Sequence, residues 1–592
     1  MRILSLIIFT AIPLLLQAQQ LSIPYANHWQ LVFNKLNQLW DWHGKYRYIK
    51  DPYSGPGVNL TGNFSSSYYE SNLSRWKDQH SLDGYFFIKS PFKYHGLYVK
   101  SWLLKEDFQD LVRNTRSFNQ RSNHALGFKG TYDFTPNFSL IPYLGYQRSQ
   151  INSIVDWGWD MGVRGEVRNY SLGDYKTHLE LSSDYDFYQH RKNSFNFINL
   201  GMKTVFSPKA RDSISVGYGN ENQQYFTPDA AYLVNSNLES KRLFNVLNYS
   251  LTNRSQLVLT TQLLSKNLLD DTPDDINDRD ILRIENKFNY QIFSSRFLFS
   301  MGVHSFSESQ DNIELATDSK LQQTGLNTYL FFDAGENDRF DLEIDFIKFQ
   351  YDTPDTASNF DDRDEIRLIG FLNYSHRFNP VLRLNIEAYI YLHHKIYIYQ
   401  EQSANNNWNR IYRLNAMVKY NNYGWRNTLM TQVLANYTVY DFDELFKDTR
   451  SFVFREYIIS DSLEIPLFTD LIFGWYGEIE LKDTGSFYKD EFSEQIQSSI
   501  NIGLYEMYIR KRNVLNFDLI AGIVVYKRED WRHMTDLKRV RNNQKISPYL
   551  SIIYPLGKNV RFVSNVSVSY LKDIGRQVST YTTGNLDLYY LF

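Results

Sequence analysis

The chain of 592 residues contains no cysteine. It therefore has no disulfide, no thiolate metal ligand and no cysteine nucleophile. It also lacks the cysteine that carries the lipid of a bacterial lipoprotein. In an oxidising compartment, the protein must be held together by backbone pairing and side-chain packing alone.

Long apolar runs are scarce as well. After residue 20, no stretch of about 18 consecutive apolar residues occurs, so the sequence predicts no transmembrane helix. The mean hydropathy is negative, which is common in soluble proteins. A membrane β-barrel shares this property, because half of each strand faces water. Hydropathy therefore leaves both classes open.

Neither sign of charge is in excess, because 63 Lys and Arg residues are matched by 66 Asp and Glu residues. A nucleic-acid-binding protein usually carries a basic stripe or domain. No such stripe is present, so no nucleic-acid partner is expected. The sequence also has no glycine-rich phosphate loop and no metalloprotease helix motif. We expect no cofactor.

The N-terminus has the layout of a secretory signal peptide. Arg2 supplies a positive charge, residues 4–16 are mostly apolar, and Gln17-Ala18-Gln19 offers a cleavage site with a small residue. The apolar stretch is too short to cross a bilayer. We therefore expect residues 1–18 to be a signal peptide and the mature chain to be secreted.

An alternation of apolar and polar residues recurs from about residue 60 to the end of the chain. In residues 281–290, 340–346 and 382–392, apolar residues at every second position are opposed by charged or polar ones. A period of two sustained this widely indicates β-strands with one apolar face. Aromatic residues form 16% of the chain, enough to supply an aromatic girdle at each membrane interface.

The connections between these segments fall into two alternating classes. Short turns, such as 135–137, 294–295 and 378–380, are separated by longer polar loops, such as 267–280 and 528–544. This alternation is typical of an up-and-down antiparallel barrel, in which short turns face the periplasm and long loops face outside. Soluble β-sandwiches are not expected to alternate short and long connections in this way.

Residues 19–58 differ from the rest. Trp29, Val32, Phe33, Leu36 and Trp40 recur at helical spacing after Asn27, a residue that can cap a helix. We expect a short helical segment here. It could plug the lumen, contact a periplasmic partner, or only pack against the barrel rim.

The last ten residues, 583–592, place apolar and polar side chains on opposite faces of a strand. The apolar face consists of Leu586, Leu588, Tyr590 and Phe592. A strand that ends on an aromatic residue resembles the closing strand of Gram-negative outer-membrane β-barrels. In those proteins, the terminal signature is read by the barrel-assembly machinery.

The resemblance to outer-membrane barrels covers the signal peptide and residues 59–592. It implies an all-β, up-and-down antiparallel transmembrane barrel of about 26 strands, closed because a bilayer tolerates no open sheet edge. The roughly 40 residues ahead of the barrel are too few for the plug domain of a TonB-dependent receptor. Large bacterial barrels enclose a wide lumen, which must then be open, narrowed by loops, or occupied by a partner.

The charged residues of the polar faces are the candidates for lining the lumen. They are Arg283, Glu285, Lys287, Asp341, Glu343, Asp345, Arg383 and Glu387. They could tune the selectivity of a hydrated route, or they could simply be the water-facing residues of a barrel wall.

Metal and catalytic candidates are weaker. One predicted loop is rich in aspartate and could attract calcium, but it lacks the glycine and distal glutamate of an EF-hand. Its residues are Asp270, Asp271, Asp274, Asp275, Asp278 and Asp280. The pair His304-Ser305 faintly resembles the His and Ser of outer-membrane phospholipases, but the surrounding motif of that family is absent. The pair His393-His394 lies near the end of a predicted strand, where neighbours point to opposite faces. We assign no metal site and no catalytic residue.

Taken together, the residues and the resemblance predict an integral outer-membrane protein, without enzymatic activity, that forms a hydrated passage for hydrophilic or large cargo. The alternative is a scaffold barrel within a multi-protein envelope complex. The expected partners are outer-membrane lipid and lipopolysaccharide, the assembly machinery during insertion, and proteins of the periplasm or cell surface.

Overall fold

A computed structural model describes residues 27–50, 55–71, 73–90, 93–110, 112–226, 233–271, 276–312, 318–354, 361–446, 448–533, 537–556, 559–573 and 577–592. Almost all of these residues lie in strands. The elements are β1 (His28–Leu36), β2 (Leu39–Lys50), β3 (Gly57–Glu70), β4 (Leu73–Ser90), β5 (Lys93–Asp110), β6 (Thr115–Thr135), β7 (Phe138–Ile151), β8 (Ile154–Leu172), β9 (Tyr175–Tyr188), β10 (Lys192–Ser207), β11 (Ala210–Phe226), β12 (Leu233–Thr252), β13 (Ser255–Asp271), β14 (Ile276–Ser294), β15 (Phe297–Asn312), β16 (Ser319–Asp333), β17 (Asp338–Asp352), β18 (Arg363–Asn379), β19 (Leu382–Tyr397), α2 (Gln400–Ser403), β20 (Asn407–Asn422), β21 (Trp425–Tyr440), η3 (Asp443–Leu445), β22 (Phe452–Phe468), β23 (Leu471–Tyr488), β24 (Ser493–Val514), β25 (Phe517–His533), β26 (Leu537–Leu556), β27 (Val560–Lys572) and β28 (Ser579–Leu591).

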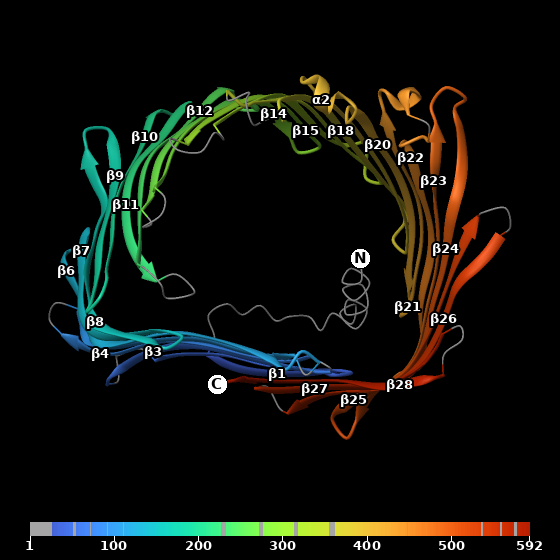
Figure 1. The fold of residues 1–592 in the computed structure, drawn as a ribbon, viewed down its shortest axis with the longest axis horizontal. Helices are drawn as coiled ribbons and strands as arrows, with labels where there is room; N and C mark the ends of the chain where they lie inside the picture. Colours follow the sequence, from blue (N-terminus) through green and yellow to red (C-terminus); the bar gives the residue numbers. More distant parts are fainter. Residues whose placement is uncertain are drawn as a thin grey trace.

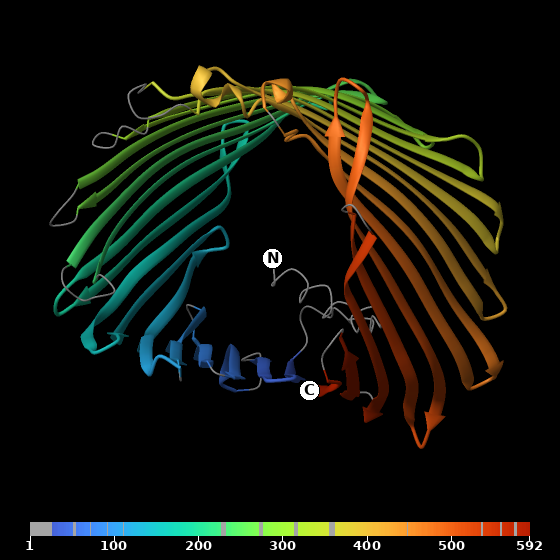
Figure 2. The same cartoon turned by 45° about the vertical axis from the view of Figure 1, so that its right-hand side comes forward.

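The strands form one closed antiparallel barrel. Each strand pairs with the next in the chain, and β1 pairs with β28, so the sheet of 28 described strands has no open edge. Figure 1 shows β1 and β28 side by side, where the first and last strands complete the ring. Figure 2 shows the strands inclined as they run along the wall. The predicted fold class is therefore confirmed.

The expected helix between residues 27 and 40 is wrong. These residues belong to β1 and to the start of β2, and both strands are part of the wall. The helical spacing of Trp29, Val32 and Phe33 coexists with a period of two, in which Trp29, Leu31 and Phe33 share one face. Pairing decides between the two patterns, because β1 pairs with β28 and β2 pairs with β3 in the closed ring.

The barrel consequently begins at His28 and not at residue 59. The strands from β3 onward number 26, as the alternation predicted, and β1 and β2 bring the total to 28 among the described residues. The predicted signal peptide, residues 1–18, lies outside the described residues.

The connections alternate along the chain as expected. One rim, here called the terminal rim, holds the start of β1, the end of β28 and mostly tight turns, such as residues 423–424 between β20 and β21. Tyr423 and Gly424 have φ values of 48° and 86°, the left-handed conformation that matches the twist of a two-residue hairpin. The opposite rim, here called the loop rim, holds the longest connections, 353–362, 398–406 and 441–451.

Several predicted loops are shorter than expected. The segment 267–280 is mostly strand, because β13 continues to Asp271 and β14 begins at Ile276. The segment 528–544 likewise lies largely in β25 and β26. The strand ends that extend beyond the apolar belt carry polar residues on both faces. Without alternating apolar residues, such strand ends resemble loops in sequence.

Candidate functional site: the inner wall of the barrel

The wall has one apolar face and one polar face. On β6 and β7, Leu126 pairs with Tyr146 and Phe128 with Leu144, and all four side chains are about half exposed or more. The alternate positions carry polar residues that hydrogen-bond across two or three strands, such as Tyr98 on β5 and Asp160 on β8. Contacts that skip strands are favoured on the concave face of a closed sheet, so the polar face is the inner one.

An apolar outer belt and a polar interior are the two faces of a membrane barrel. The protein is therefore a large β-barrel of the outer-membrane type. No helix in the described part of the chain is long and apolar enough to cross a membrane.

The predicted lumen-lining residues lie on the polar faces of three strands. Arg283, Glu285 and Lys287 are on β14, Asp341, Glu343 and Asp345 on β17, and Arg383 and Glu387 on β19. They do not form one cluster, and their role along a hydrated route stays a prediction.

Several of these residues are paired with their neighbours. The Arg283 Nε donates to Glu308 at 2.6 Å, and the Lys287 ammonium lies 2.6 Å from Glu285. Asp341 accepts hydrogen bonds from the Tyr329 hydroxyl at 3.2 Å and the Asn373 amide at 3.3 Å. Cross-strand pairs of opposite charge stabilise a sheet modestly, so part of this lining strengthens the wall.

The inner wall also contains a recurrent arrangement, here called a Tyr–Gly–carboxylate row. A tyrosine lies over a glycine on the next strand and donates its hydroxyl hydrogen to a carboxylate one strand further on. In one row, Tyr143 on β7 pairs with Gly162 on β8, which pairs with Asp184 on β9, and Tyr143 donates to Asp184.

A second row has the same geometry across the barrel. Tyr508 on β24 pairs with Gly474 on β23, which pairs with Glu464 on β22, and the Tyr508 hydroxyl donates to Glu464 at 2.8 Å. A methyl group at Gly474 would collide with the Tyr508 ring. The glycine is therefore required by close approach of a ring, as expected of glycine within a strand.

The longest row spans four strands. Tyr98 on β5 is in register with Gly127 on β6, Gly145 on β7 and Asp160 on β8. The Tyr98 hydroxyl donates to Asp160 at 2.9 Å, and Tyr98 is only 4% exposed. Because a hydrogen bond to a charged group is stronger than a neutral one, these rows tie non-adjacent strands together.

Buried ion pairs reinforce the wall near the loop rim. The Glu365 carboxylate is 3% exposed. It lies 2.9 Å from both the Arg363 Nε and the His393 Nε2 and also contacts the Arg367 guanidinium. In the turn between β9 and β10, Arg191 donates to the buried Asp156 at 3.3 Å. A buried charge is tolerated when it is paired in this way.

The histidine pairs behave as adjacent strand residues should. His393 contacts Glu365, whereas His394 contacts Asp441 at 2.9 Å and stacks on Trp408. His304 contacts the Gln323 amide at 3.0 Å. These contacts give the three histidines structural partners, and the absence of catalysis stays a prediction.

The acidic candidate for calcium is only partly described. Asp270 and Asp271 lie at the end of β13, and Asp278 and Asp280 lie in β14, where the Asn267 amide contacts both of the latter. Asp274 and Asp275 lie outside the described residues. In the described part of the chain, no group of three or more potential ligands is placed to hold a metal ion.

At the loop rim, two connections are joined by hydrogen bonds. Asp443 in η3 accepts from the backbone N–H groups of Arg450 at 2.7 Å and Ser451 at 3.1 Å, and from the Thr449 hydroxyl. The Arg450 guanidinium donates to the Ala404 carbonyl at 2.9 Å, just after α2. Burial alone would raise the pKa of Asp443, but these hydrogen bonds outweigh it and lower that pKa.

The C-terminal strand closes the ring. In β28, Leu586, Leu588 and Tyr590 pair with Phe33, Leu31 and Trp29 of β1, so the apolar residues meet on one face. On the other face, the Gln30 amide donates to Asp587 at 3.1 Å. Recognition of this strand, with Phe592, by the assembly machinery stays a prediction.

Comparisons with known proteins identify only distant similarity. No protein-family model matches the sequence, and no curated protein matches it. Among solved structures, the alcaligin outer-membrane receptor FauA of Bordetella pertussis is 12% identical, with a TM-score of 0.37 over 79% of this chain and 81% of that one.

Two other receptors or transporters are similar to the same degree. The copper transporter OprC is 10% identical, with a TM-score of 0.40 over 96% of this chain and 80% of that chain. FpvA of P. aeruginosa is 9% identical, with a TM-score of 0.41 over 96% of this chain and 71% of that chain. Similarity this low assigns no family and no cargo, and the architecture is established by the strand pairing itself.

Proposed function

We propose that the protein is an integral outer-membrane barrel that forms a hydrated passage for hydrophilic or large cargo. The observation that supports this most is the closed ring with its polar inner face. No strand or helix among the described residues crosses the ring (Figure 1). The location in the outer membrane rests on the barrel fold together with the expected signal peptide.

The strand number sets the size of the passage. Twenty-eight strands, spaced about 4.8 Å apart and tilted by about 40°, have a perimeter of about 175 Å, equal to a circle about 55 Å across. Side chains on the inner face reduce this width by about 10 Å, by analogy with the spacing of packed sheets. Such a lumen admits folded loops, polymers or a small protein as well as small solutes.

Planar-bilayer recording of the purified full-length mature chain tests the proposal. We expect a large, persistent conductance that falls when polyethylene glycols of about 15 Å radius enter the lumen, given the width estimated above. A folded barrel that stays non-conducting would contradict the passage. If stoichiometric protein partners also copurify with such a barrel, the scaffold role replaces it.

The predicted lining supplies a sharper version of this test. Lys287→Glu combined with Arg383→Glu should shift the reversal potential toward cation selectivity. The measurement belongs at about 0.01 M salt, where the screening length of about 30 Å is comparable with the lumen radius. Lys209→Glu, in the turn between β10 and β11, is the control for a single charge reversal, and an equal shift per reversed charge there would remove these residues from the lining.

A further inference from the structure

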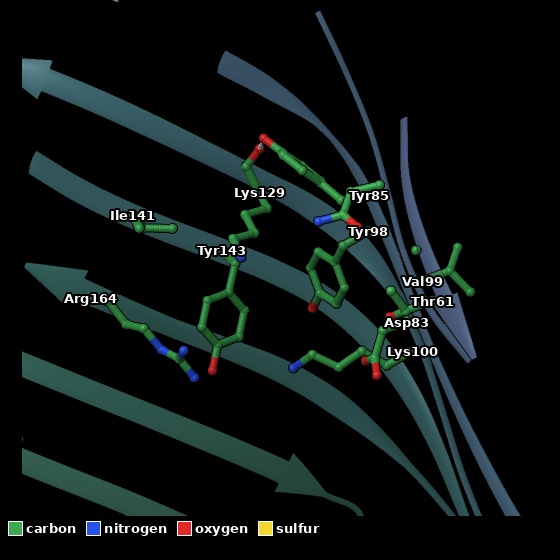
Figure 3. Close-up of a pocket in the computed structure, with 12 residues that line it drawn as sticks. Thr61, Asp83, Tyr85, Tyr98, Val99, Lys100, Lys129, Ile141, Tyr143 and Arg164 are labelled. Atoms are coloured by element: carbon green, nitrogen blue, oxygen red, sulfur yellow. Dashed lines mark hydrogen bonds between the residues drawn. The ribbon is translucent and has the colours of Figure 1, made fainter. Parts of the chain in front are cut away.

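A pocket of about 220 Å³ lies on the wall formed by β3 to β8. Its lining includes three cations, Lys100, Lys129 and Arg164, and three tyrosines, Tyr85, Tyr98 and Tyr143. Figure 3 shows the Lys100 and Arg164 side chains approaching the Tyr143 ring from opposite sides. All six residues belong to the polar face that we identified as the inner one.

Glycine gives this part of the wall its depth. Gly96 pairs with Lys129, so no side chain separates Lys129 from the neighbouring strand β4. Gly127 and Gly145 let the Tyr98 ring lie flat toward Asp160, and a methyl group at Gly145 would collide with the Tyr98 hydroxyl. The glycines thus leave room at the backbone for this hollow.

The lining residues carry three cations against one carboxylate, while Asp160 and Asp184 lie behind them on the Tyr98 and Tyr143 hydroxyls. Lys100 lies 3.6 Å from Asp160, but Lys129 and Arg164 take part in no ion pair among the described residues. Two other cations, Arg164 and Lys100, lie near the half-buried Lys129. Asp83 is the only carboxylate in the lining. Like charges held together repel, so an anion would be favourable here.

The hydroxyl groups of two lining tyrosines are already used within the wall. Tyr98 and Tyr143 pack edge to face with centroids 5.8 Å apart, and their hydroxyls are occupied by Asp160 and Asp184. The Lys100 ammonium lies 5.4 Å from one ring centre and 5.2 Å from the other. Tyr98 is almost completely buried, so a ligand meets mainly the Tyr143 ring, with cations beside it.

Polar groups suited to hydroxyls complete the lining. Asn59, Thr61 and Asp83 provide an amide, a hydroxyl and a carboxylate on β3 and β4. A sugar ring has C–H groups that pack on an aromatic face and hydroxyls that bond to such groups. The volume is below the about 300 Å³ of a site for a drug-sized ligand, so it suits one sugar unit of a longer chain.

We propose that this pocket binds a saccharide unit that carries a carboxylate or phosphate group. Lys129 and Arg164 hold the anionic group, and the partly exposed Tyr143 ring contacts the sugar, with the buried Tyr98 ring behind it. The assignment rests on the proposed function only in requiring that this face be exposed to a hydrated lumen. The pocket is then a binding site for an anionic saccharide on the inner wall.

Calorimetric titration of the detergent-purified full chain tests the site without requiring transport. The probes are glucose 6-phosphate, glucuronate, glucose and inorganic phosphate. We expect the two anionic sugars to bind at least tenfold more tightly than either glucose or phosphate. Loss of one charge-assisted contact, in Lys129→Gln or Arg164→Gln, should weaken anionic-sugar binding about tenfold.

Lys419→Gln, which removes an inner-face cation on β20 far along the chain from the pocket, is the matched control and should leave binding unchanged. Each variant must first show the resistance to SDS of the parent barrel, so that a folding defect is recognised. Equal binding of phosphate and glucose 6-phosphate would overturn the saccharide assignment. An absence of saturable binding in a barrel that conducts would overturn the site while leaving the passage intact.

Discussion

Gly145 offers a direct test of the Tyr–Gly–carboxylate rows. A Cβ atom at this position would collide with the Tyr98 hydroxyl and lie 2.9 Å from the Leu126 carbonyl oxygen. Gly145→Ala should therefore expel the Tyr98 ring from its flat position and break its hydrogen bond to Asp160. The Asp160 carboxylate would keep only the more distant Lys100 among the partners described above.

The magnitude follows from what is lost. A hydrogen bond to a charged group contributes about 1.5–3 kcal/mol, and leaving a buried partner unsatisfied adds to this cost. We expect Gly145→Ala to lower the free energy of unfolding by about 2–4 kcal/mol. Urea unfolding of the barrel in lipid vesicles, followed by tryptophan fluorescence, measures the change.

A double-mutant cycle isolates the ring. In a Tyr98→Ala background, Gly145→Ala should cost less than it does in the parent chain, because the colliding hydroxyl is absent and only the approach to the Leu126 carbonyl oxygen remains. Gly165→Ala, also on the strands of this region, is the matched control, since its Cβ would meet Leu140 at an ordinary 3.6 Å. Equal costs for the Gly145 and Gly165 variants, or no coupling with Tyr98, would refute the reasoning.

Three further predictions concern other parts of the barrel. The hydrogen bonds to Asp443 lower its pKa against the opposing effect of burial. The ionised carboxylate should therefore stabilise the loop rim fully at pH values above 3.8, the ordinary pKa of an aspartate. This stabilisation should be lost as the pH falls through the lower pKa of the folded state. Proteolysis of the 441–451 connection should therefore increase in acid, and Asp443→Asn should be cleaved readily at either pH. Arg191→Ala leaves the 2% exposed Asp156 with only its longer contacts to His190, at 3.4 Å, and should cost about 3–5 kcal/mol in urea unfolding; a cost below about 1 kcal/mol would mean that His190 or water compensates this carboxylate. Deleting residues 28–50 removes β1 and β2, so no SDS-resistant barrel should form, whereas a folded barrel would show that β3 and β28 can close the ring alone.

The sequence predicts the strands well because their signal is local. Each period-two segment, such as 382–392, reports its own apolar face without reference to any other segment. The closing strand β1 was misread because nine residues, His28–Leu36, fit both a helical and an alternating pattern. Its true state depends on β28, whose Asp587 lies 557 residues from the Gln30 that contacts it, and no local pattern carries that information.

The Tyr–Gly–carboxylate rows were missed for a related reason. Tyr98 and Asp160 are 62 residues apart in sequence, and only the register of four strands aligns them. A signal was nevertheless available. Glycines recur at positions 127, 145, 158 and 162, and glycine within a strand often marks close approach of another group.

The central claim is that one face of the wall contacts lipid and the other contacts water, and the absence of native cysteine makes it directly measurable. Single cysteines would be placed in turn at Ile284, Glu285, Glu343 and Ile344 in the membrane-inserted barrel, and labelled with a charged, water-soluble maleimide. We predict rapid labelling at 285 and 343 and little labelling at 284 and 344, following the period of two. Equal labelling at all four positions would contradict the account.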